Sequence, residues 1–224
     1  MTVKQFFLSS VGKKIVMGGT GIFLILFLIV HAGLNATIWA NDGGEMFEKG
    51  AHFMGGNVIP RILEVGLFLF IILHIVQGLM LEAENRTKRG IGYKRNYGNR
   101  GSKWYSRSMG ILGVLILMFL IIHLAHFWIP NRSSQDWVRL DGEIPLYEEM
   151  KYVFSNPVIV IIYVVSCIVL AFHLLHGFQS AFRSLGVHNK RYNTFINACG
   201  VIYSILIPLI FALMPISFYF GWIS

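Results

Sequence analysis

The sequence predicts an all-α membrane protein in which five transmembrane helices form one bundle. Hydrophobic residues make up 55% of the 224-residue chain and charged residues only 13%, against roughly 25% charged residues in soluble domains. The mean hydropathy is +0.61, and five apolar runs reach the length of about 20 residues that a bilayer requires. Cys167 and Cys199 lie apart without a CxxC spacing, so no cysteine redox or metal motif is present. A soluble, disordered or secreted disulfide-bonded protein is excluded.

The predicted spans cover residues 15–40, 58–81, 108–129, 152–181 and 193–222. The first is too long for the apolar core of a cleavable signal peptide, and no small-residue cleavage site precedes the next polar stretch. Pro60 suits the first turn of the second helix, whereas Pro208 and Pro215 should kink or shorten the fifth. Without internal repeats or low-complexity linkers, we expect a single domain over residues 1–224.

The basic residues predict the orientation. Fourteen of the 19 Lys and Arg residues lie on one side of the membrane, joined there by only Glu82 and Glu84 among the acids. By the positive-inside rule the N-terminus is cytoplasmic and the C-terminus outside. This distribution accounts for the net charge of +8 without a nucleic-acid partner. The most basic segment, residues 86–107, is either a docking surface for a cytoplasmic partner or only a determinant of topology.

Six of the eight histidines lie inside the predicted spans: His31, His74, His123, His126, His173 and His176. An ionisable side chain at that depth is costly, so it should face the bundle interior and have a function. At 1.5 Å per residue, His31 and His123 lie about 25 Å from the cytoplasmic edge. By the same rise, His74 and His176 lie about 10–12 Å deep. Four helices therefore offer two pairs of imidazoles, each matched in depth.

Two facing imidazoles at equal height are what a six-coordinate haem takes as axial ligands. The two levels therefore predict two haems and an electron path across the membrane. A helix–helix hydrogen bond explains a lone histidine, but six on four helices favour ligands. A proton relay needs no depth-matched pairs, and a zinc site needs three or four ligands at one height. His126 and His173 are expected to contact propionate, backbone or quinone rather than iron. Depth alone hardly separates His173 from His176 on the fourth span.

Glycines near the histidines suit either a flat macrocycle between helices or close helix packing. They are Gly18, Gly19, Gly21, Gly78, Gly110, Gly113 and Gly177.

The stretches around the histidines carry a family resemblance. They read FLIVHAGLN, ILHIVQG, FLIIHLAHF and HLLHGFQSAFRSLG in spans one to four. With these and the opening SSVGKK, the chain resembles the di-haem cytochrome b subunits of succinate:quinone oxidoreductases, in the single-anchor, five-helix type of menaquinone-using bacteria. The resemblance covers nearly the whole chain. Its most specific part is the LHG motif followed by Phe182 and Arg183.

The resemblance implies haem ligands, partners and a function. The family's axial ligands fall on His31 and His123 for the haem far from the cytoplasm, and on His74 and His176 for the near haem. The implied protein anchors a succinate dehydrogenase or fumarate reductase in the bacterial inner (cytoplasmic) membrane. It passes electrons from a flavoprotein and an iron–sulfur subunit through two haem b groups to menaquinone, while the dicarboxylate chemistry lies on another chain. The extra histidine on the third and on the fourth span leaves a swapped ligand open at either level.

A quinone site needs a hydrogen-bonding group for each oxygen and a protonatable relay. The candidates near the far haem are Asn35, Trp39, Glu48, His52, Arg61, Glu64 and His126, with the two glutamates and His126 preferred. The alternative interpretation is that Glu48 is an exposed loop charge and that Glu64 forms an ion pair with Arg61. Arg183, Lys190 and Arg107 either balance haem propionates or are snorkelling topology charges.

Three alternatives stay open. A di-haem subunit of nitrate reductase or formate dehydrogenase also has four ligating histidines, but its ligand spacing and flanking motifs differ. A haem-free structural anchor would leave the histidines as packing residues. A proton-coupled transporter needs broken helices around a midplane cavity, and only the fifth span has the prolines for that.

Overall fold

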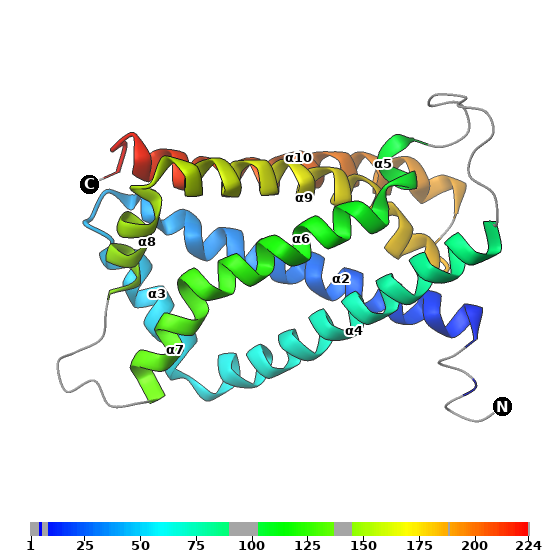
Figure 1. Ribbon diagram of the computed structural model, residues 1–224, viewed down its shortest axis with the longest axis horizontal. Coiled ribbons are helices and arrows are strands. Elements are labelled where there is room, and N and C mark those ends of the chain that lie inside the picture. The colour runs from blue at the N-terminus through cyan, green and yellow to red at the C-terminus, as the bar shows by residue number, and fades with distance from the viewer. Residues whose placement is uncertain (1–4, 6–8, 90–102, 137–144, 188, 224) are drawn as a thin grey trace. The chain divides into compact units, whose positions relative to one another are not determined.

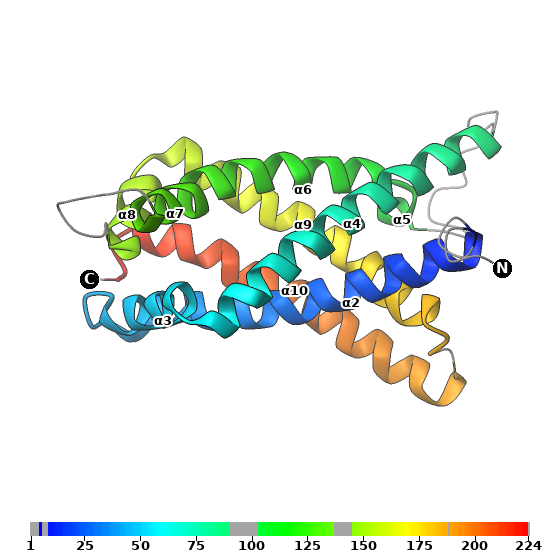
Figure 2. The same ribbon diagram turned by 90° about the horizontal axis from the view of Figure 1, so that it is seen from below.

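The computed structural model describes residues 5, 9–89, 103–136, 145–187 and 189–223, which form helices and turns with no strand among them (Figure 1; Figure 2). In chain order the helices are α2 (Ser10–Asn35), η1 (Ala36–Ala40), α3 (Glu45–Gly56), α4 (Val58–Arg89), α5 (Trp104–Arg107), α6 (Met109–His123), η2 (Leu124–Trp128), α7 (Ile129–Asp136), α8 (Leu146–Phe154), α9 (Pro157–Ser184) and α10 (Lys190–Tyr219). The η1 segment is a 3-10 helix and η2 is a π-helix.

Five helical stretches of the described residues are long and apolar enough to cross a membrane. They are Val11–Ala40, Val58–Thr87, Met109–Arg132, Pro157–Ser184 and Arg191–Tyr219. The prediction of five apolar spans in an all-helical chain is therefore confirmed, and Pro60 lies in the first turn of α4 as expected. The orientation of the termini and the single domain stay predictions.

The fourth span begins later than the predicted residue 152. Tyr152 belongs to the separate helix α8, and α9 begins at Pro157. Between them the Ser155 hydroxyl donates to the Tyr152 carbonyl at 2.7 Å, and the Asn156 side chain accepts from the backbone N–H of Val158 at 2.9 Å. An asparagine N-cap followed by proline is a strong helix start, and the prediction of a span from residue 152 passed over this signal.

The prolines of the fifth span do not shorten it. Helix α10 continues through Pro208 and Pro215 to Tyr219. It ends where Gly221 adopts a left-handed φ of 64° and the backbone N–H of Trp222 donates to the Ser217 carbonyl at 2.9 Å. This closure of the last turn favours glycine, which has no Cβ to strain at positive φ.

The chain divides into two compact units. The first unit comprises Met1–Phe27, Val65–Val114 and Leu170–Ile205, and the second comprises Leu28–Glu64, Leu115–Val169 and Leu206–Ser224. Each long helix contributes a segment to both units, because the boundaries fall inside α2, α4, α6, α9 and α10.

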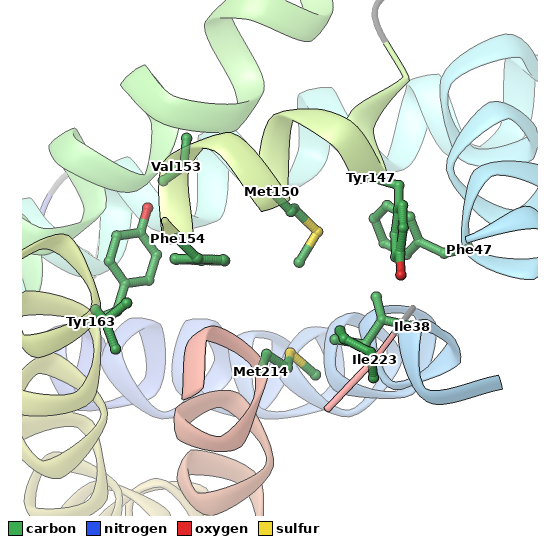
Figure 3. Packing of buried hydrophobic residues seen from close by; sticks show 10 residues of the cluster. Ile38, Phe47, Tyr147, Met150, Val153, Phe154, Tyr163, Met214 and Ile223 are labelled. Atoms are coloured by element: carbon green, nitrogen blue, oxygen red, sulfur yellow. The ribbon is translucent and has the colours of Figure 1, made fainter. Parts of the chain in front are cut away.

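Two short helices that the span analysis did not predict, α3 and α8, build the core of the second unit. Tyr147, Met150 and Phe154 on α8 pack in one cluster with Phe47 of α3 (Figure 3). Phe47 and Tyr147 are each only 2% exposed. Helix α8 contacts both α3 and the π-helix η2. The cluster therefore links the connections between spans to the third span.

Two groups on α3 and the turn before it fix the start of α8. The Glu48 carboxylate accepts from the backbone N–H of Tyr147, one of the N–H groups that a helix N-terminus leaves unpaired. Pro145 at the N-cap gives α8 no side-chain hydrogen bond of its own. Gly44 has a φ of 87°, and a Cβ at this position would collide with the Tyr147 ring. Glu48 thus caps α8 from a neighbouring helix.

Replacing Gly44 by alanine should lower the apparent unfolding temperature more than replacing Gly43. Both glycines have a left-handed φ, 87° and 70°, which costs an L-residue roughly 1–2 kcal/mol. Only at Gly44 would the new Cβ also displace the Tyr147 ring, whereas at Gly43 no described atom lies within 4 Å. Thermal unfolding in detergent, followed by circular dichroism, measures the difference. Equal losses in the two variants would contradict the packing role of Gly44.

Candidate functional site

The histidines of the spans fall into two groups of three, one in each compact unit. The second unit holds His31, His123 and His126, and the first holds His74, His173 and His176. The histidines expected at the two depths therefore lie in different units.

In the second unit, α2 and α6 bring two imidazoles together. The ring centres of His31 and His123 lie 5.9 Å apart, with an angle of 89° between the ring planes. Phe211 packs against His31, and Phe119 and Phe127 pack against His123. The Nδ1 atom of His123 is buried, without a hydrogen-bond partner among the described residues. This second-unit pair therefore lies in an aromatic, water-poor environment with one imidazole nitrogen unsatisfied.

In the first unit, the ring beside His74 belongs to His173 rather than to His176. The two ring centres are 6.3 Å apart, with 67° between the planes. The Nδ1 atom of His173 is also buried and unpaired within the described part of the chain. His176 is half-buried one turn further along α9. The ligation of iron by His176, implied by the resemblance, stays a prediction.

A threonine of α2 fixes the proton of His74. The Thr20 hydroxyl donates to the Val16 carbonyl at 2.8 Å, and its oxygen lies 3.1 Å from His74 Nδ1. Because the hydroxyl proton is already used, the oxygen accepts from Nδ1–H, which leaves the Nε2 lone pair available. Metal-ligating histidines almost always donate their other N–H in this way. Thr20 is 2% exposed, so the hydrogen bond is shielded from water.

The ring-centre distances of both pairs lie in the range for two imidazoles on one metal, and equally in the range of an ordinary edge-to-face ring contact. A metal ion lies about 2 Å from each coordinating nitrogen, which puts two such ring centres roughly 6 Å apart. The observed separations are 5.9 and 6.3 Å. Rotation about each metal–nitrogen bond leaves the angle between the planes free. Within the described ranges, no three His, Cys, Asp or Glu side chains gather as a metal site, so the pairs suit a metal that brings its other ligands with it, as haem iron does.

The glycines divide between the two expected functions. A Cβ at Gly21 would meet Ala181 at 3.5 Å and His74 at 3.9 Å, so this glycine leaves room beside the imidazole. At Gly18 a Cβ would lie only 3.0 Å from the Ala181 carbonyl oxygen, which shows close packing of α2 on α9. Gly110 lies similarly close to the side chain of Glu82.

His126 of the π-helix η2 is hydrogen-bonded to a tyrosine that the sequence analysis missed. Its Nδ1 lies 3.0 Å from the Tyr163 hydroxyl oxygen of α9, and the two rings stack with 15° between their planes. Tyr163 also packs against the rings of His123, Phe119 and Phe154. No sequence pattern identified this tyrosine, because a single aromatic residue in an apolar span carries no signal of its own.

The Glu64 carboxylate is held by three donors at the start of α4. Oε1 accepts from the Trp128 indole N–H at 2.6 Å. Oε2 is ion-paired with Arg132 and lies 4.0 Å from Arg61. The expected Arg61 pair is present but long, and the shorter contacts come from η2 and α7. Glu64 therefore ties the π-helical region of the third span to the second.

Of the remaining quinone candidates, Trp39 has a distant partner on α10 and Asn35 has a local partner on α2. The Trp39 indole N–H donates to Ser217 Oγ at 3.0 Å. The Asn35 amide donates to the His31 carbonyl at 2.8 Å and lies 3.4 Å from His31 Nδ1. His52 is exposed on α3.

Two of the basic residues form ion pairs with glutamates, and others lie outside the described residues. Lys13, 7% exposed, forms an ion pair with Glu84, and Arg86 pairs with Glu82 at 2.6 Å. Arg183 is exposed, and the side chain of Lys190 lies outside the described part. The centre of the basic segment, residues 90–102, is also outside the described residues.

Comparison with known proteins gives one informative similarity. The chain is 24% identical over 199 residues to the succinate dehydrogenase cytochrome b558 subunit of Bacillus subtilis (strain 168), a match that covers 86% of this chain and 88% of that protein. No protein-family model matches the chain, and no solved structure matches it. The similarity to the Bacillus protein supports the resemblance to the succinate dehydrogenase cytochrome b family.

Replacing Thr20 by valine should weaken cofactor binding at His74. The change removes the acceptor that holds Nδ1–H, and loss of such a partner typically lowers metal affinity about 10–100-fold. Haem content per chain after dilution into detergent measures this effect. Thr37→Val is the matched control. The Thr37 hydroxyl also donates to a backbone carbonyl of the preceding turn, that of Leu34, at 2.7 Å. Within the described residues, it makes no hydrogen bond to a histidine. Equal haem retention in both variants would contradict the anchoring role of Thr20.

Proposed function

We propose that this chain is the membrane anchor and electron-transfer subunit of a succinate:menaquinone oxidoreductase in the bacterial inner membrane. It passes electrons from the iron–sulfur subunit through two b-type haems to quinone. The observation that carries the proposal is that histidines of different long apolar helices meet in each compact unit, His31 with His123 and His74 with His173. The similarity to the Bacillus succinate dehydrogenase subunit over most of both chains supports it.

Two sets of residues would hold the haems. His31 and His123 would hold the haem of the second unit, and His74 with His176 the haem of the first. A bound haem supplies reversible one-electron transfer. The protein fixes the imidazoles through side chains such as Thr20 and excludes water with the aromatic rings around them. These are the means by which a polypeptide sets a haem potential.

The proposed soluble partners are a flavoprotein and an iron–sulfur subunit. Succinate or fumarate chemistry would take place on the flavoprotein, since this chain contributes only to electron transfer and anchoring. The basic segment 86–107 is the proposed docking surface, with Lys103 and Arg107 among its described residues. Arg183, exposed at the end of α9, is the proposed neutralising charge for a propionate in the first unit.

For the quinone, the contacts favour His126 over the two glutamates. Glu48 accepts from the α8 backbone, and both oxygens of Glu64 already accept hydrogen bonds or ion pairs. His126 uses only Nδ1 for a hydrogen bond within the described residues. We therefore propose His126 as the main quinone contact, with the glutamates positioning the helices around it.

Two b-type haems per chain are the expected result of a reduced-minus-oxidised optical spectrum combined with a haem assay. One haem is proposed for each unit, so His31→Ala or His123→Ala should remove one and His74→Ala the other. A colourless purified protein would contradict the proposal and leave a haem-free anchor. Two haems without association with succinate dehydrogenase subunits would indicate the di-haem subunit of another quinone-linked complex.

The choice between His176 and His173 needs its own measurement. The resemblance assigns the iron to His176, whereas the ring contact with His74 belongs to His173. We expect His176→Ala to lose the first-unit haem and His173→Ala to retain it, because the family resemblance assigns the ligand to His176. Low-temperature spectra of both variants decide the matter. Loss of haem in His173→Ala alone would assign the ligand to His173.

A further inference from the structure

The hydrogen bond between His126 and Tyr163 determines where the histidine carries its proton. Nδ1 of His126 and the Tyr163 hydroxyl oxygen are 3.0 Å apart. Tyr163 is only 6% exposed, so its hydroxyl group has little access to solvent. Within the described residues His126 is its hydrogen-bond partner. One hydrogen bond must therefore satisfy both groups.

Counting protons leaves one arrangement that satisfies the tyrosine. A phenol has one proton to donate, and a neutral imidazole has one N–H and one bare nitrogen. If Nδ1 carried the proton, it would donate to Tyr163, and the buried phenol proton would have no acceptor. A buried donor without an acceptor is costly. If the Tyr163 hydroxyl donates to a bare Nδ1, both groups are satisfied and the imidazole proton sits on Nε2.

We propose that Tyr163 holds His126 as the Nε2–H tautomer, which makes His126 a hydrogen-bond donor for a carbonyl oxygen and prevents it from ligating iron. Iron binds a bare ring nitrogen, and the bare nitrogen of His126 is occupied by Tyr163. The inference rests on the proposed function for the identity of the ligand, a quinone carbonyl. It also gives the two histidines of the third span different functions, in which His123 binds iron and His126 donates to the quinone carbonyl.

His74 provides the opposite case within the same chain. There the Thr20 oxygen accepts from Nδ1–H, because the Thr20 hydroxyl already donates to the Val16 carbonyl. His74 thus keeps a bare Nε2 for a metal, whereas His126 presents Nε2–H. The hydrogen-bond partner of Nδ1 is a threonine for His74 and a tyrosine for His126. This partner determines whether Nε2 is a bare nitrogen or an N–H.

The position of His126 also suits a ligand contact. It lies in the π-helix η2, and such single π-helical turns within helices are frequent at functional sites. The His126 side chain is half-buried, so part of its ring remains open to a ligand.

Nitrogen-15 NMR of histidine-labelled protein in bilayers tests the tautomer directly. The His126 signals are those lost in His126→Leu, and we expect a bare Nδ1 and a protonated Nε2. Tyr163→Phe should shift the Nδ1 signal. Tyr203→Phe is the matched control: this tyrosine hydroxyl donates to the Ile25 carbonyl at 2.7 Å, so its removal should leave the His126 signals unchanged. A protonated Nδ1 in the unmodified protein would overturn the inference.

Binding of a short-chain naphthoquinone to the assembled complex tests the donor role. We expect about 5–10-fold weaker binding for His126→Leu and for Tyr163→Phe, the usual effect of one lost hydrogen bond. The double variant should bind no more weakly than His126→Leu, because Tyr163 acts through His126. Both variants should retain two haems. Unchanged naphthoquinone affinity in His126→Leu, or loss of a haem from it, overturns the inference. Absence of haem from the unmodified protein would instead contradict the proposed function, and the NMR spectrum would still decide the tautomer.

Discussion

The hydrogen bond at Nδ1 of a buried imidazole is the interaction on which the proposed histidine functions depend. Away from water, an unpaired polar atom loses its hydration without compensation. Thr20 bonds to His74 and Tyr163 to His126, each at Nδ1. The identity of that partner decides whether the opposite nitrogen is a lone pair or an N–H. In the proposed assignment, chemically equivalent histidines thereby take different functions within one fold.

The connections between spans maintain this arrangement in the second unit. Glu48 caps α8 through the backbone of Tyr147, and Glu64 ties η2 and α7 to α4 through Trp128 and Arg132. Both glutamates are thus engaged in fixing helices around the π-helical turn. Carboxylates at the ends of spans can look like proton carriers in a sequence, yet here their oxygens are occupied by neighbouring donors. Their structural function is what lets His126 keep a defined position.

The sequence predicted the large-scale features well and the fine ones poorly, for physical reasons. Hydropathy identified all five spans, because the requirement for a long apolar helix is local in the chain. Counting residues from the predicted cytoplasmic edge placed the histidines at two expected depths, because the rise per residue of a helix is constant. Helices α3 and α8 were missed, since their stability depends on contacts such as Tyr147 with Phe47 that join distant segments. Depth also could not separate His173 from its neighbour one turn away, because both lie on the same side of α9 and differ little in height.

Two of the buried histidines have a nitrogen that the polypeptide leaves unpaired. In each ring pair, one imidazole has a polar side chain near its Nδ1, and the other has a buried Nδ1 with no hydrogen-bond partner in the described part of the chain. The unpaired nitrogens belong to His123 in one unit and His173 in the other. Gln77, Tyr147 and Asn197 also have a buried atom without a partner there, so an unpaired atom does not identify a ligand by itself. Burying a polar atom without a partner is costly, and a group bound beside these imidazoles would offset that cost. The meeting of two imidazoles from different helices in each unit is therefore the main indication of a ligand, to which the unpaired nitrogens only add.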